Sequence, residues 1–300
     1  MTLFRYLILF LVINLSAYRV DSQIIPIDTS FNPTKFYTII GVESALYAGS
    51  MTGLWYAWYD DYSSGQFHFF NDNAEWLQMD KLGHAQTSYF FGKIGYDFMR
   101  GAGINKSKSL IYGGGIGFFY LSTVEVLDGF SKGWGFSWGD MAANALGTAL
   151  FVSQQSFFDR QILSVKYSYY PSQYSVYRPN VLGNNHLQRL IKDYNGQTYW
   201  LSANISAFLP KESSFPKWLN VAFGYGADGL LGGFSNPVST DIPLFDRNRN
   251  FYLSLDLDLT QIPVDNVWLK SLLHVFSFIK IPFPSLEFGS DGVKFHPIYF

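Results

Sequence analysis

The sequence contains no cysteine and few charged residues. The absence of cysteine excludes disulfides, thiolate metal sites, cysteine nucleophiles and lipid attachment at a cysteine. Charged residues form only 15% of the 300 residues, and the formal net charge is -2, with no run of lysine and arginine. A nucleic-acid partner is therefore excluded, because phosphate binding requires clustered positive charge.

Aromatic residues, by contrast, are abundant. They form 19% of the chain, within an apolar content of 48% that is sufficient for a folded core. Amphipathic aromatic rings favour membrane interfaces. The composition therefore predicts a folded protein with a membrane as its partner.

The N-terminus has the organisation of an export signal. Arg5 supplies a positive charge, residues 6–13 form an apolar run, and Val20-Asp21-Ser22 precedes a cleavage site at Gln23. The apolar run is shorter than the roughly 20 residues of a membrane span. We expect residues 1–22 to be a signal peptide and the mature protein to work in a bacterial cell envelope; an uncleaved anchor is the alternative.

Two periodicities divide the rest of the chain. Long, weakly polar runs predict helices before residue 158, and alternation with a period of two predicts strands beyond Tyr169. The predicted helices are Tyr37–Tyr59, Glu75–Arg100, Ser107–Asp128 and Ser137–Phe157. The predicted strands are Tyr199–Leu209 and Phe251–Leu259, with weaker candidates at Leu219–Ala227 and Leu286–Phe295 and an amphipathic helix at Val264–Lys280.

This pattern predicts an α+β fold. A four-helix bundle, associated with a membrane, would occupy residues 35–158, and a small antiparallel sheet with one amphipathic helix would occupy residues 186–300. A linker over 159–185 would join them, since residues 170–185 are rich in Pro, Tyr, Asn and Ser. Four or five strands are too few for a closed outer-membrane barrel, which needs at least about eight.

Small residues recur one turn apart in the predicted helices. Gly113 and Gly117 form one such pair, and Ala143 and Gly147 form another. This spacing lets helix backbones approach closely, in a membrane bundle or in a soluble one. We interpret the glycine-rich segment 113–117 as a packing surface.

Three predicted helices each carry a pair of polar residues. Residues three or four positions apart share a helix face, with Lys81 turned about 100° away from its neighbour Asp80. In an antiparallel bundle with short connections the pairs lie at one end, so we expect them to converge. The pairs are Asp80 and His84, Glu125 and Asp128, and Asp140 and Asn144.

Two interpretations of this cluster stay open, because buried carboxylates must be paired, protonated or bound to a cation. In a catalytic or divalent-cation site, His84 would be a neutral ligand or general base, and Asp80, Glu125, Asp128 and Asp140 would supply oxygen ligands. In a structural network, the same groups would lock the register of the helices, with Asp140 complementing a helix dipole.

The segments that carry the cluster also resemble a known family. DKLGH at 80–84, EVLDGFS at 125–131 and WGFSWGDMAANALG at 134–147 are similar to the YfiM-like family of predicted bacterial envelope lipoproteins, a family of unknown function. Their order also resembles that of VanZ-like membrane proteins. The resemblance covers about residues 72–155 and implies an envelope location and a small helical membrane bundle, but no reaction. The absence of cysteine departs from the lipoprotein pattern.

Three classes of function follow. The first is a structural or binding protein of the envelope, associated with a membrane. The second is an envelope hydrolase that acts on a lipid-linked or phosphorylated substrate through the acidic and histidine cluster, although Gly-x-Ser-x-Gly, His-Glu-x-x-His and phosphate-loop motifs are absent. The third is a binding module whose sheet holds a glycan or another envelope protein. The sequence leaves open whether the protein is an enzyme.

Overall fold

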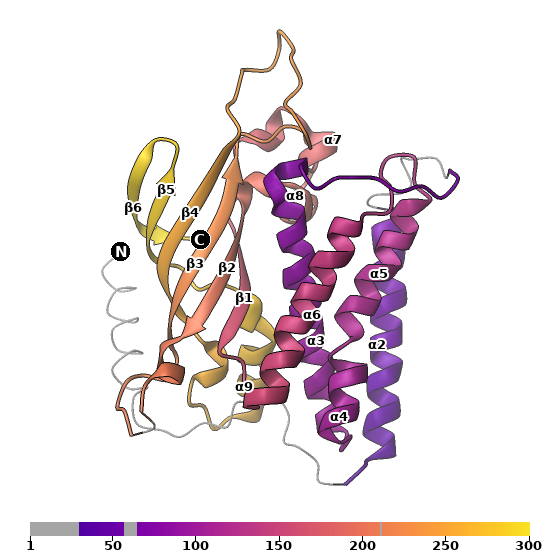
Figure 1. The fold of residues 1–300 in the computed structure, drawn as a ribbon, viewed down its shortest axis with the longest axis vertical. Coiled ribbons are helices and arrows are strands. Elements are labelled where there is room, and N and C mark those ends of the chain that lie inside the picture. Colours follow the sequence, from indigo (N-terminus) through magenta and orange to yellow (C-terminus); the bar gives the residue numbers. More distant parts are fainter. Residues whose placement is uncertain (1–29, 57–64, 211) are drawn as a thin grey trace.

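The protein combines helices with one six-stranded antiparallel sheet. The computed structural model describes residues 30–56, 65–210 and 212–300, so the predicted signal peptide lies outside the described residues. The long helices stand on one side of the sheet, and they run in roughly the same direction as its first four strands (Figure 1). The predicted α+β class is confirmed.

Four long helices form the first part of the described chain. They are α2 Pro33–Leu54, α3 Met79–Gly101, α5 Ile116–Gly129 and α6 Trp138–Phe158. Helix α3 packs against both α5 and α6. Helix α2 has no buried residue and reaches α5 through Tyr47, whose ring centroid lies 5.8 Å from that of Tyr120. A regular four-helix bundle is therefore not confirmed, since α2 lies at the edge of the group.

Helix α3 begins later than its sequence predicts. The predicted first turn, Glu75–Gln78, is a short 3-10 segment η2, in which Trp76, Leu77 and Gln78 have φ angles of 48°, 50° and 67°. The backbone N–H of Trp76 donates to Gly233 at 2.8 Å, and the Leu77 carbonyl accepts from Tyr225 at 2.6 Å. These contacts to the second half of the chain keep Trp76, Leu77 and Gln78 out of the α-helical conformation, so α3 starts at Met79.

The predicted third helix is also divided. Short α4 Lys106–Lys108 and the π-helical turn η3 Ser109–Gly113 precede α5. The predicted close crossings are present at its glycines: a Cβ on Gly113 would lie 2.4 Å from the Gly95 carbonyl oxygen, and one on Gly117 would lie 2.3 Å from that of Ser88. Both contacts are to α3, so Gly113 sets the distance of η3 from α3, and Gly117 sets that of α5.

Substitution of Gly117 tests this packing. Gly117→Ala is expected to destabilise the protein by about 1–3 kcal/mol, because the new methyl group would meet the α3 backbone. The matched control is Gly49→Ala in α2, where nothing lies within 4 Å of the new methyl. The control should stabilise the helix by up to about 1 kcal/mol. Denaturant unfolding measures both, and equal effects would contradict a tight α3–α5 contact.

The sheet is a meander in which each strand pairs with the next. The strands are β1 Leu163–Tyr169, β2 Gln197–Asn204, β3 Leu219–Asp228, β4 Asn248–Leu257, β5 Phe283–Gly289 and β6 Gly292–Tyr299. The sheet thus has six strands, where the sequence predicts four or five.

Two differences explain that count, and a third changes the length of a strand. The segment 159–185, predicted above as a linker, contributes β1, since the Pro-rich stretch begins only after Tyr169. The predicted strand Leu286–Phe295 is a hairpin of two strands that turns at Ser290 and Asp291. The predicted strand Tyr199–Leu209 ends at Asn204 and continues as the 3-10 turn η6 Ile205–Phe208.

Short helical segments connect the strands. The predicted amphipathic helix is shorter than expected and consists of α9 Val267–Val275 and η8 Phe276–Phe278. The others are η4 Tyr174–Val176, α7 Pro179–Leu182, α8 His186–Lys192, η5 Tyr194–Gly196 and η7 Leu259–Gln261.

Helices and sheet meet through aromatic side chains. Fully buried Met79 at the start of α3 packs with Tyr199 of β2 and Tyr225 of β3. Further along, Val165 of β1 packs against the buried rings of Tyr89 and Phe151. The first turns of α3 are therefore fixed against the sheet, and they carry the polar cluster.

The opposite face of the sheet is polar and buried. Lys166 Nζ lies 2.6 Å from Asp256 Oδ2, and the Ser202 hydroxyl donates to the same oxygen at 2.6 Å. The Asn220 amide in turn donates to Ser202 at 2.9 Å. The alternation in the sequence predicts half-buried strands, and the buried half holds these polar groups together with the rings of Trp200 and Tyr252.

Candidate functional site

Three helix ends bring the predicted polar residues together. Asp80 and His84 lie in the first turns of α3, Glu125 near the end of α5, and Asp140 and Asn144 in the first turns of α6. Helix α6 begins there because the Ser137 side chain caps it, accepting a hydrogen bond from the Asp140 N–H at 3.1 Å. The cluster therefore forms where the ends of three helices meet.

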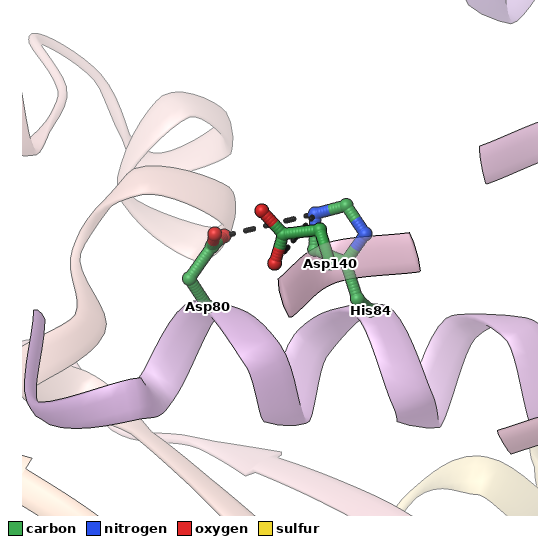
Figure 2. A group of neighbouring side chains, drawn as sticks. All are labelled: Asp80, His84 and Asp140. Atoms are coloured by element: carbon green, nitrogen blue, oxygen red, sulfur yellow. Dashed lines mark ion pairs between the residues drawn. The ribbon is translucent and has the colours of Figure 1, made fainter. Parts of the chain in front are cut away.

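His84 lies at the centre of the cluster. Its Nε2 is 3.7 Å from Glu125 Oε1, 3.9 Å from Asp80 Oδ1 and 3.9 Å from Asp140 Oδ1. Figure 2 shows Asp80 and His84 projecting from one side of α3 towards Asp140. These distances are too long for hydrogen bonds, so three carboxylates surround Nε2 without contacting it.

A second set of contacts orients these groups. His84 Nδ1 lies 3.0 Å from Asn144 Oδ1, so Nδ1–H donates and Nε2 is the nitrogen that faces the carboxylates. Asp80 Oδ1 accepts from the Tyr194 hydroxyl at 2.6 Å, and Glu125 Oε2 accepts from the Ser137 N–H at 3.1 Å. In neutral His84, the Nε2 lone pair would therefore point at three carboxylates, which is unfavourable unless a proton or a cation lies between them.

Lys81 occupies one side of the cluster. Its Nζ lies 2.7 Å from Asp72 Oδ1, 2.8 Å from Asp140 Oδ1 and 3.6 Å from Asp80 Oδ2. The sequence places Lys81 on another face of the helix, but its long, flexible stem brings the ammonium group back to Asp140.

The charges of the cluster do not balance. Four carboxylates, those of Asp72, Asp80, Glu125 and Asp140, surround one ammonium group and one imidazole. Even with His84 protonated, two negative charges would lack a partner if every carboxyl group were ionised. The cluster must therefore hold additional protons or bind a cation.

Two further buried atoms of the cluster lack a hydrogen-bond partner among the described residues, apart from Lys81 Nζ and Asp140 Oδ1, which form an ion pair with each other. Glu125 Oε1 and Asn144 Nδ2 have none, although their residues are 1% and 0% exposed. An orphaned carboxylate oxygen in a buried site costs about 1–3 kcal/mol or more. Because Glu125 Oε1 is the atom that faces His84, the missing partner belongs in the centre of the cluster.

The donor atoms lie close to a metal-binding arrangement. One ligand atom each from Asp80, His84 and Asp140 lies within 4.8 Å of the other two. A zinc ion holds nitrogen and oxygen ligands at about 2.0–2.2 Å, so ligands around one ion are about 3–4 Å apart. Small side-chain movements would bring these three groups around one ion.

A cavity opens beside the cluster. It has a volume of about 470 Å³ and lies between the helices and the sheet. Acidic residues and aromatic rings line it together. The acidic residues are Asp72, Glu75, Asp80, Asp128 and Asp140. This lining suits a cation or a ligand that carries one, and would repel a free phosphate group.

Burial and the charges of the cluster also shift the pKa values of neighbouring residues at the cavity. Burial raises the pKa of Glu75, and the negative charges of Asp72 and Asp80 add to the effect. Burial opposes ionisation of Asp72, but hydrogen bonds from Asp140, Lys81 and Ser137 outweigh it and hold the pKa of Asp72 below its usual range. Burial and Asp80 raise the pKa of Tyr194 well above its ordinary value, so Tyr194 stays a hydrogen-bond donor.

Sequence reasoning identified one part of this site and missed another. The structure joins Asp80, His84, Glu125, Asp140 and Asn144, and it places Asp128 in the cavity wall. Asp72, Ser137 and Tyr194 were not predicted. Ser137 could have been identified as a helix cap before Asp140, whereas Tyr194 comes from beyond β1 and no local pattern indicates it.

Comparison with known proteins places the cluster within one family model. Residues 68–155 match the model described as "Predicted periplasmic lipoprotein (DUF2279)", and every cluster residue except Tyr194 falls within this match. Searches of curated proteins and of solved structures find no match. The resemblance to YfiM-like and VanZ-like sequences stays a prediction. The family description is that of an exported protein of unknown function, and the chain is accordingly a cell-envelope protein.

Proposed function

We propose that this envelope protein binds a divalent cation through Asp80, His84 and Asp140, at the wall of its acidic cavity. The observation that carries the proposal is the position of His84 Nε2, which faces three carboxylates at 3.7–3.9 Å without contacting them. The bond from Nδ1–H to Asn144 is the outer contact that orients a metal-binding histidine. One nitrogen and two or three oxygen donors suit Zn²⁺ or Mn²⁺.

Calorimetric titration tests the proposal. The purified protein is freed of metal with a chelator and titrated with Zn²⁺, alongside the variants His84→Ala and His186→Ala. We expect one site in the wild type, its loss in His84→Ala, and unchanged binding in His186→Ala, since His186 begins α8 and is exposed. Equal binding by the His84→Ala and wild-type proteins, or no binding by either, would contradict the proposal.

The affinity for the cation should depend on pH in a definite direction. A cation and a proton compete for His84 Nε2 and for the surrounding carboxylates, so binding releases protons. The affinity is expected to fall as the pH is lowered from about 8 to about 6, by up to about tenfold per pH unit for each proton displaced. Titration in buffers of different ionisation enthalpy counts the released protons. An affinity that rises on acidification would contradict binding at His84.

A second candidate function is hydrolysis assisted by the bound cation. The cavity supports it, because the acidic wall continues into apolar side chains, including Leu54, Phe91 and Phe278, which could hold a lipid-linked substrate. A phosphorylated substrate would approach this wall only if a cation bridges it to the carboxylates. Turnover of a chromogenic phosphate ester by the Zn²⁺-loaded protein, but not by His84→Ala, would support this function.

A further inference from the structure

The two faces of the sheet have the reverse of the usual polarity. One row of register partners across all six strands is entirely apolar, and the neighbouring row on the opposite face consists mainly of small polar residues. The apolar row is Val165, Leu201, Phe223, Leu253, Leu286 and Phe295. The second row is Ser164, Ser202, Ala222, Ser254, Ser285 and His296.

The apolar row is the exposed one. In this row the helices cover Val165, and on the same face they also cover Tyr199 of β2 and Tyr225 of β3. In the rest of the row, Leu201, Phe223 and Leu253 are 42%, 53% and 44% exposed, whereas Ser202 and Ser254 on the other face are 0% and 5% exposed. An antiparallel sheet that faces water on one side presents its polar residues there. In these two rows this sheet does the opposite from β2 to β6.

We infer that the exposed apolar part of this face, from Leu201 of β2 to Phe295 of β6, lies against the hydrocarbon of a lipid bilayer. Apolar residues outside and polar residues inside are the pattern of closed barrels embedded in membranes, and the open sheet described here shares that pattern. The lengths also agree: β3 and β4 have 10 residues each, or about 33 Å when extended, against a hydrocarbon thickness of about 30 Å. The buried Lys166–Asp256 pair fits the polar interior of such a sheet.

Helices α2, α5 and α6 also expose large apolar side chains. Leu46 of α2, Phe119 of α5 and Leu146 of α6 are 66%, 65% and 69% exposed. Residues 106–129 are long and apolar enough to cross a membrane, and only 28% of their most apolar window is buried. In Figure 1 the sheet and helices α2 and α5 stand on opposite sides. A single protein partner covers one side, whereas a bilayer surrounds both, and this favours lipid as the occupant.

The composition agrees with direct contact to lipid. The matching family is described as a lipoprotein, yet these 300 residues contain no cysteine to carry an acyl chain. Exposed apolar faces provide attachment without one.

The absence of cysteine also permits a clean test. A single cysteine is introduced at Phe223 or at Leu253 in the apolar row, and at Thr240 in the exposed loop before β4 as control. Each variant carries an environment-sensitive fluorophore and is reconstituted into phosphatidylcholine vesicles. Lipids with a mid-chain doxyl group quench labels in the hydrocarbon, and iodide quenches labels in water.

Labels on Phe223→Cys and Leu253→Cys should lose most of their fluorescence to the doxyl lipid and little to iodide, with the reverse for Thr240→Cys. Two positions in one row guard against misfolding of a single variant, and thermal melting in detergent checks each. Labels in the apolar row that iodide quenches as strongly as the control would overturn the inference. So would shielding from both quenchers together with a doubled molecular mass, since a second copy of the chain would then cover this face.

Discussion

Replacing Asp140 by asparagine is expected to lower the affinity for a divalent cation by at least about 100-fold. Loss of a group that only orients a metal ligand commonly costs about 10–100-fold, and Asp140 is proposed as a ligand itself. The change keeps the volume of the side chain and removes its charge. Asp72 remains 2.7 Å from Lys81, so the lysine keeps a partner.

The same variant should not unfold the metal-free protein. Asp140 is 3% exposed and faces the other carboxylates around His84, so removing its charge relieves repulsion. Proteins with strained functional sites commonly gain stability when one of the repelling charges is removed. Calorimetry measures the affinity and thermal melting the stability. Strong destabilisation with unchanged cation affinity would identify Asp140 as a structural residue.

Replacing Lys166 by methionine is expected to destabilise the protein by about 3–5 kcal/mol. The ammonium group of Lys166 lies 2.6 Å from Asp256, and the two side chains are 2% and 0% exposed. Removing one member of a buried pair leaves the other charge without compensation, which costs far more than the pair contributes. Ser202 would be left as the hydrogen-bond donor to Asp256 Oδ2.

Two matched variants make this result specific. Lys106→Met breaks an exposed pair with Asp159 of similar length, 2.7 Å, and should cost at most about 1 kcal/mol. The double variant Lys166→Met with Asp256→Leu removes both charges of this pair and should recover part of the lost stability, because buried Lys280 also interacts with Asp256. Denaturant unfolding in detergent compares them. If the double variant were as unstable as the single one, the loss would come from packing and not from a stranded charge.

The sequence predicted the fold class and the helical core of the site, because both depend on local spacing. Asp80 and His84 are four residues apart and therefore share a face of α3 wherever the helix packs. Strand alternation was equally local, and β3 and β4 lie close to their predicted ranges.

Other features depended on contacts between distant segments. Helix α3 starts only at Met79 because the hydrogen bonds to Gly233 and Tyr225 keep the preceding residues out of the α-helical conformation. Tyr194 joins the cluster only because the sheet packs against α3. The buried side of the sheet was equally inaccessible, since alternation specifies two faces but not which one the protein encloses.

The most direct test of the central claim, that the cluster holds a divalent cation, is thermal melting with and without Zn²⁺, for the wild type and for Glu125→Gln. Glu125 Oε1 faces His84 Nε2 at 3.7 Å and is fully buried. A cation at about 100 times its dissociation constant should stabilise the wild type by about 2.7 kcal/mol. The variant should melt at or above the temperature of the metal-free wild type and gain much less from Zn²⁺. If Zn²⁺ left the melting temperature of the wild type unchanged and Glu125→Gln were strongly destabilised, the cluster would instead be a network that locks the helices in register.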